Sequence, residues 1–72
     1  MDKYEEINCL RLSRKIKVER ITQNLSRDKL GDMSGMSGAT IANIETDAEK
    51  ALFKNIIAIA KALDVSLAEL LF

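Results

Sequence analysis

The sequence predicts an all-α fold of five short helices in a single domain, residues 1–72. Apolar residues recur three and four positions apart, which is the helical period, and no stretch alternates as a half-buried strand would. The chain contains no proline, so its helices have to end at glycine, asparagine or a capping side chain. A length of 72 residues is enough for one domain and too short for two.

The first helix is expected over about residues 4–23, with residues 1–10 as its N-terminal extension. Its apolar stripe is approximate. Asn24 is suited to the left-handed conformation that often ends a helix. The residues expected to face inward are Ile7, Leu10, Leu12, Ile16 and Ile21.

The second helix is expected over residues 27–34. Ser26 is a good N-terminal cap and Gly35 a good stop. Leu30 and Met33 are expected to face inward, because they lie three positions apart.

The third helix is expected over about residues 38–45. Ser37 is its predicted cap, and Ile41 and Ile44 are its predicted buried residues. Residues 46–50 are expected to form a loop, since this polar stretch has no apolar periodicity.

The last two helices follow from periodicity and from a capping motif. A fourth helix is expected over about residues 52–63, followed by a turn at residues 64–65. Ser66 and Glu69 have the spacing of a capping box and predict a final helix over residues 66–72. The predicted apolar face of the fourth helix comprises Phe53, Ile56, Ile57, Ala60 and Leu63.

Residues 27–45 have the layout of a DNA-binding helix-turn-helix: two short helices joined by a three- or four-residue turn that contains glycine. The second helix has to be short and exposed to enter a major groove. Gly31 lies inside the first of the two helices, where glycine costs about 1 kcal/mol relative to alanine. A glycine is tolerable there if the second helix crosses at this point and a side chain would block close approach. A generic helical hairpin would have the same spacing.

Two runs of sequence resemble the Cro/XRE-type (phage-repressor) helix-turn-helix family. LSRDKLGDMSGMSGATIANIE, Leu25–Glu45, is similar to the family's helix-turn-helix, and IAIAKALDVSLAELL, Ile57–Leu71, is similar to its fourth and fifth helices. The resemblance implies a compact, lambda-repressor-like domain with its helix-turn-helix at about residues 27–45. The positions that match the first pattern are Leu25, Ser26, Leu30, Gly35, Ser37, Ile41, Ile44 and Glu45.

The resemblance also implies roles for individual residues. Arg20 and Glu45 would form a structural ion pair. Base reading would fall to the outer face of the third helix, where Asn43 can bond adenine through two hydrogen bonds. The base-reading positions are Gly38, Ala39, Ala42 and Asn43. The positions that would contact the DNA backbone are Ser26, Arg27, Ser37, Thr40, Lys50 and Lys54.

The charge distribution adds a weaker argument. Formal net charge is zero, but residues 11–29 contain seven basic and two acidic residues, a local charge of +5. Such a run supports DNA binding only if the fold directs it towards a groove; on its own it is typical of a solvated helix face.

The apolar C-terminus predicts self-association. It has more large apolar side chains than one short final helix needs to pack against its own domain. An exposed Phe72 would leave an apolar patch on the surface of a monomer. We expect a homodimer that binds a pseudo-palindromic operator as a transcriptional regulator, with half-sites roughly 34 Å apart. The predicted interface residues are Leu67, Leu70, Leu71 and Phe72.

An alternative function is a protein-interaction module, antitoxin-like or an anti-repressor partner, that keeps the fold and binds DNA weakly. The small side chains of the third helix favour this alternative, and so does the acidic loop that contains Asp47 and Glu49. The dependence of binding affinity on salt concentration distinguishes the two functions. Contacts to phosphate weaken steeply as the salt concentration rises, whereas an apolar protein interface does not.

An enzyme, a metal site and a membrane role are not expected. The chain has no histidine, and its only cysteine, Cys9, therefore has no histidine to activate it. The glycines do not form a phosphate-binding pattern, so no cofactor is expected. One unpaired thiol, the absence of a signal-like N-terminus and the absence of a long apolar run predict a cytoplasmic protein.

Overall fold

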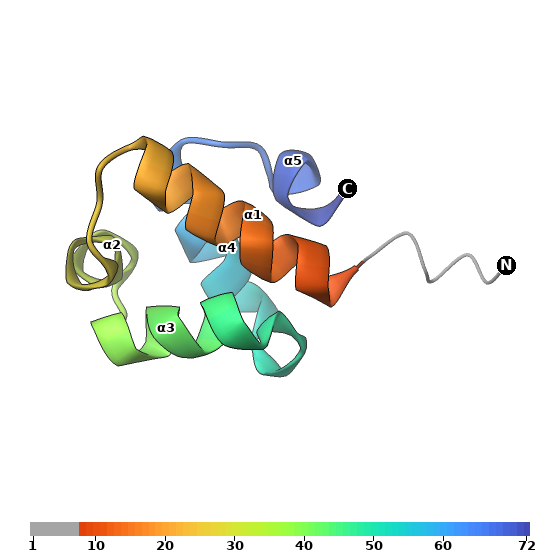
Figure 1. Ribbon diagram of the computed structural model, residues 1–72, viewed down its shortest axis with the longest axis horizontal. Helices are drawn as coiled ribbons and strands as arrows, with labels where there is room; N and C mark the ends of the chain where they lie inside the picture. The colour runs from red at the N-terminus through yellow and green to blue at the C-terminus, as the bar shows by residue number, and fades with distance from the viewer. Residues whose placement is uncertain (1–7) are drawn as a thin grey trace, which may run out of the picture.

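The computed structural model describes residues 8–72, and within this range the chain is helical with no strand (Figure 1). The prediction of an all-α, five-helix fold is confirmed. One further turn of 3₁₀ helix, η2, occupies most of the predicted loop. The elements are α1 (Cys9–Thr22), α2 (Arg27–Ser34), α3 (Gly38–Thr46), η2 (Ala48–Lys50), α4 (Phe53–Leu63) and α5 (Leu67–Leu71).

Helix α1 begins later than its apolar pattern suggests. Asn8 is extended, and its side chain accepts a hydrogen bond of 3.0 Å from the backbone N–H of Arg11, so it caps the helix. The predicted start near residue 4 and the predicted role of Ile7 lie outside the described residues. At the other end, Asn24 has a φ of 58°, the left-handed conformation that was predicted for it.

The buried face of α1 differs from the predicted one. Leu12 and Ile16 are buried as expected, but Leu10 and Ile21 are 57% and 54% exposed, so the prediction for these two is wrong. The reason is that α1 uses two polar residues, Ser13 and Arg20, on its inner face. Both are held by hydrogen bonds that a hydropathy pattern does not register.

The crossing of α2 and α3 depends on Gly31. A Cβ atom on Gly31 would lie 2.7 Å from the carbonyl oxygen of Met36, closer than real Cβ contacts, so the turn packs directly on this backbone. Gly35 adopts a φ of 75° and ends α2 as predicted. Leu30 is buried, but Met33 is exposed, because the narrow inner side of α2 is occupied by Leu30 and Gly31.

Helices α4 and α5 complete the core. In α4, Ile56, Ala60 and Leu63 are buried as predicted. Of the other two predicted residues, Phe53 is exposed and Ile57 is half-buried, and Ile59, which was not predicted, is in the core. Phe53 is the first residue of α4. The predicted capping box of α5 is confirmed by hydrogen bonds in both directions between Ser66 and Glu69.

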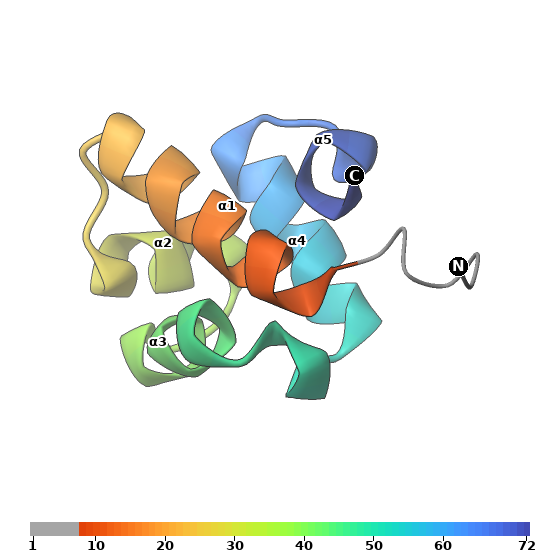
Figure 2. The same cartoon turned by 45° about the vertical axis from the view of Figure 1, so that its right-hand side comes forward.

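A small apolar core joins all the helices. Figure 2 shows α5 folded back beside α1 and α4, and Arg11 donates a hydrogen bond to the carbonyl oxygen of Phe72. Within residues 8–72, no helix combines the length and apolar character needed to cross a bilayer. The buried apolar residues are Leu12, Ile16, Leu30, Ile41, Ile44, Ala48, Ile56, Ile59, Ala60, Leu63 and Leu70.

Candidate nucleic-acid interface

Helix α3 presents an uncovered ridge of small side chains. Ala39 and Asn43 are exposed, and Ala42 is half-buried beside them. Its inner side is fixed by Ile41 and Ile44, which are both in the core as predicted. The helix is therefore held from one side only, and its opposite side is free for a ligand.

Two shallow hollows flank this ridge. The α2 hollow lies between α3 and the N-terminal end of α2, and the α4 hollow lies between α3 and the beginning of α4. The α2 hollow is lined by Arg20, Ser26, Arg27, Asp28, Gly38, Ala39 and Ala42. The α4 hollow is lined by Thr40, Asn43, Ile44, Thr46, Asp47, Lys50, Ala51, Leu52 and Asn55.

The serines that were predicted to contact a DNA backbone cap the two helices of the motif. Ser26 accepts a hydrogen bond of 3.0 Å from the backbone N–H of Lys29, and Ser37 accepts one of 3.1 Å from that of Thr40. The hydroxyl groups of Ser37 and Thr40 also lie 3.0 Å apart. The helix dipole favours an anion at such an N-terminus. At the beginning of α3, the carboxylate of Asp28 already lies beside the backbone of Gly38.

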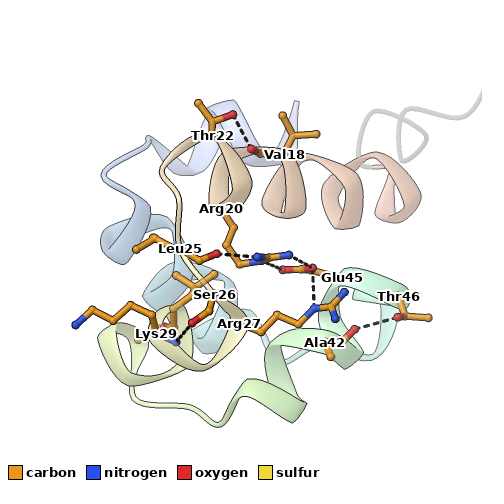
Figure 3. A network of polar contacts seen from close by, with 12 residues as sticks. Val18, Arg20, Thr22, Leu25, Ser26, Arg27, Lys29, Ala42, Glu45 and Thr46 are labelled. Atoms are coloured by element: carbon orange, nitrogen blue, oxygen red, sulfur yellow. Dashed lines mark hydrogen bonds and ion pairs between the residues drawn. The ribbon is translucent and has the colours of Figure 1, made fainter.

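A network of three charged side chains joins α1, α2 and α3 (Figure 3). Arg20 donates from Nε and Nη2 to the two carboxylate oxygens of Glu45, at 2.7 and 3.2 Å, and from Nη1 to the carbonyl oxygen of Leu25 at 2.7 Å. Arg27 donates from Nε to Glu45 at 3.3 Å. The Glu45 side chain is 2% exposed, so one buried carboxylate binds both guanidinium groups. Arg20 and Glu45 thus form the pair that the family resemblance implies.

Gly38, predicted to read bases, is half-buried. A Cβ atom at this position would lie 1.9 Å from a carboxylate oxygen of Asp28, so the Asp28 side chain occupies the space beside the backbone of Gly38. The glycine therefore allows the N-terminal ends of α2 and α3 to approach, with a carboxylate between them.

The predicted backbone contacts near α4 lie on the far side of the ridge. Lys50 lines the α4 hollow, and its ammonium group is 3.9 Å from a carboxylate oxygen of Asp47. Lys54 is exposed in the first turn of α4. Asn55 also lines this hollow with Asn43, and sequence reasoning missed it. The available signal was an uncharged polar residue in the first turn of a mainly apolar helix.

The basic run of residues 11–29 is divided between two faces. Arg20 and Arg27 line the α2 hollow, but Arg11, Arg14 and Lys15 line a separate hollow on the outer face of α1. That outer hollow shares no residue with the two hollows beside α3. The run therefore does not form one continuous basic face beside α3, because α1 has its inner face towards α3.

The predicted dimer residues also have different environments. Leu70 is 1% exposed and belongs to the protomer's own core, so its assignment to an interface between protomers is wrong. Leu67 and Leu71 are half-buried against that core, and Phe72 is 51% exposed. The prediction failed for Leu70 because α5 turns this side chain inward onto α1 and α4.

No group of three or more acidic or cysteine side chains that could hold a metal ion occurs among residues 8–72. The chemistry that the site offers is hydrogen bonding from Asn43, two capped helix N-termini and a few basic groups around an exposed helix.

Comparisons with known proteins agree with this architecture. A helix-turn-helix family model matches residues 16–70, well over half of the chain. No curated protein matches the sequence significantly. The chain is similar in structure to the P22 c2 repressor protein in complex with a synthetic operator, with 28% identity and a TM-score of 0.76 over 83% of this chain and 91% of that one.

Two further solved structures show the same fold at lower identity. The restriction-modification controller protein C.AhdI from Aeromonas hydrophila is 24% identical with a TM-score of 0.80, over 86% of this chain and 94% of that one. SinR, the master regulator for biofilm formation, was solved in complex with DNA. It is 22% identical with a TM-score of 0.73, over 82% of this chain and 95% of that one. By its family match and its five-helix architecture, the chain belongs to the Cro/C1-type helix-turn-helix family.

Proposed function

We propose that the chain is a sequence-specific, DNA-binding transcriptional regulator. The observation that carries this proposal is the exposed ridge of α3 with a capped helix N-terminus on each side of the α2 hollow. A protruding helix of nine residues fits a major groove, and helix N-termini favour phosphate oxygens at its edges. Two similar structures, the P22 c2 repressor and SinR, contain an operator and DNA respectively.

Asn43 is the principal base reader in this proposal. It is exposed, and it is the one polar side chain of α3 that makes no hydrogen bond within residues 8–72. Its amide can bond N6 and N7 of adenine at the same time. Ala39 and Ala42 offer methyl groups to thymine, and Gly38 permits close approach without reading a base.

Backbone contacts would come from both sides of the ridge. Ser26 and Ser37 offer the helix N-termini on one side, with Thr40 beside Ser37. Lys50 and Lys54 offer positive charge on the other, where Asn55 adds an amide. Such contacts set affinity and register but carry no sequence information. Arg27 differs from this group because its ion pair with Glu45 holds it beside α3.

The experiment combines selection of duplexes from a random pool with fluorescence anisotropy. The selected duplex should bind more tightly than its scrambled version, and affinity should fall about a hundredfold or more between about 50 and about 200 mM salt. Asn43→Ala should reduce the preference between the two duplexes. Its matched control, Lys54→Ala, should lower affinity for both equally and reduce the salt slope by about one. Selection of no sequence would overturn the proposal.

Homodimerisation on a pseudo-palindromic operator is part of the same proposal. The exposed Phe72, flanked by Leu67 and Leu71, remains a candidate contact between protomers after Leu70 is removed from the set. Phe72→Asp should reduce the mass in light scattering from that of a dimer to that of a monomer. Met33→Asp, which changes an exposed apolar residue on α2, should leave the mass unchanged. A dimeric Phe72→Asp protein would place the interface elsewhere.

A second candidate function is a protein-interaction module, and the outer face of α1 favours it. Leu10, Val18 and Ile21 are each more than half exposed there, beside the basic Arg11 and Arg14. An apolar surface with a basic rim fits an acidic amphipathic partner. If the selected duplexes bind weakly and without salt dependence, this face becomes the site to test, with Val18→Lys as the variant.

A further inference from the structure

We infer that Arg27 is a specificity-determining residue that reads guanine, rather than a contact to the DNA backbone. The inference rests on the proposed DNA binding and deepens it. It starts from the ridge of α3, where Gly38, Ala39 and Ala42 carry no polar side-chain group. Because these residues are small, the side of α3 that faces α2 leaves space for a long side chain from the neighbouring helix.

Arg27 extends into that space from the first position of α2. Figure 3 shows its side chain reaching across to Glu45 near the end of α3. Its Nε donates to Oε1 of Glu45 at 3.3 Å, and it lines the α2 hollow together with Gly38, Ala39 and Ala42. The guanidinium group therefore lies beside the ridge that would enter the groove.

The partner that holds Arg27 is itself fixed by hydrogen bonds. The Glu45 side chain is almost fully buried and is bound by two nitrogens of Arg20, which also donates to the carbonyl oxygen of Leu25. A carboxylate fixed in this way gives the Arg27 guanidinium a defined direction. A defined direction reduces the rotamer entropy that a flexible arginine would lose on binding.

The hydrogen-bonding edge that remains on Arg27 suits guanine. Glu45 uses Nε, so both terminal nitrogens, Nη1 and Nη2, are left without a partner among residues 8–72, and the side chain is 48% exposed. Two parallel N–H donors from one guanidinium match the O6 and N7 acceptors of guanine in the major groove.

The charges around the Arg27 guanidinium disfavour a phosphate inside the α2 hollow, so the phosphates that the helix N-termini favour would lie at its rim. Asp28 lines the hollow, with its carboxylate beside the backbone of Gly38, and the Glu45 carboxylate already binds the guanidinium. A phosphate that entered here would meet a second carboxylate as well as the cation. The edge of a base has no net charge, so the two carboxylates do not repel it as they would repel a phosphate.

The test compares the sequences selected from a random pool by the wild-type chain, Arg27→Ala and Arg27→Lys. Wild type should require guanine at one position in each half-site, and both variants should lose that preference. In anisotropy, replacing that guanine by adenine should weaken wild type by about tenfold or more and each variant by less than about twofold. Lysine keeps the charge, so Arg27→Lys separates base reading from general attraction to phosphate.

Two controls make the outcome decisive. Lys29→Ala removes the same charge from the same helix and should keep the guanine preference. Replacing the guanine by 7-deazaguanine removes only N7 and should weaken wild type but not Arg27→Lys. If both variants select the wild-type sequence with uniformly lower affinity, Arg27 contacts the backbone and the inference is overturned. If wild type selects no sequence, the proposed function itself has failed.

Discussion

The inner face of α1 buries two polar side chains, Ser13 and Arg20, whereas its outer face exposes Leu10, Val18 and Ile21. A surface helix of a globular protein usually has the reverse arrangement. The two buried polar residues both bind the C-terminal end of α3. Hydrogen bonds are directional and apolar contacts are not, so the inner face of α1 fixes the orientation of α3 as well as its position.

Ser13 shows how this fixation works. Its hydroxyl donates to the carbonyl oxygen of Ile44 and accepts from the backbone N–H of Ala48, both at 2.9 Å. These two backbone groups would bond one another if α3 continued for another turn. The hydroxyl joins them instead, so α3 ends at Thr46 and the chain turns into η2.

Among the variants that test the comparison between the two faces of α1, Glu45→Ala is expected to change stability most. This change removes the counter-charge of Arg20 while that guanidinium remains mostly buried, which should lower the free energy of unfolding by about 3–5 kcal/mol. Urea denaturation followed by circular dichroism measures it. Asp32→Ala, an exposed acid on α2, is the control and should change stability by less than about 0.5 kcal/mol. A loss of under about 1 kcal/mol in Glu45→Ala would show that the Arg20–Glu45 ion pair is not needed to hold α3.

An intermediate effect is expected from Ser13→Ala. Loss of the hydroxyl leaves the buried carbonyl of Ile44 and N–H of Ala48 without this partner, which should cost about 1–3 kcal/mol. Thr22→Ala is a matched control on the same helix, because its exposed hydroxyl bonds only to the carbonyl of Val18 one turn earlier. Equal stability losses in the two variants would contradict a special role for Ser13.

The smallest effect on stability is expected from a change on the outer face of α1. Val18→Lys replaces an exposed apolar side chain and should change the free energy of unfolding by less than about 0.5 kcal/mol. Thermal denaturation at two protein concentrations measures it. A clear, concentration-dependent loss of stability would mean that this face is covered by another copy of the chain. The comparison between the two faces of α1 would then need revision.

Much of the candidate site could be predicted, because the positions on α3 follow from the family pattern and from its predicted bounds. The contact between Arg27 and Glu45 could not. It depends on the angle at which α2 crosses α3, and that angle is set by how closely the backbone approaches Gly31. Asn55 was missed for a similar reason, since only the fold brings it to the same hollow as Asn43.

The sequence by itself determined several of the helix ends. Ser26, Ser37 and Ser66 cap their helices, and Asn24 and Gly35 adopt the left-handed conformation, as predicted. These interactions join residues at most a few positions apart in the chain. The local sequence is therefore enough to predict them.

Only the tertiary structure decided several of the positions that are buried. Leu10 and Phe53 are exposed where the pattern predicted burial, and Leu70 is buried where it predicted an interface. Burial depends on partners distant in the sequence, such as the end of α3 for Ser13 and Arg20. A periodic pattern records the polarity of a residue but not what its neighbours in space offer it, and a hydrogen-bonded polar side chain can displace an apolar one from the inner face.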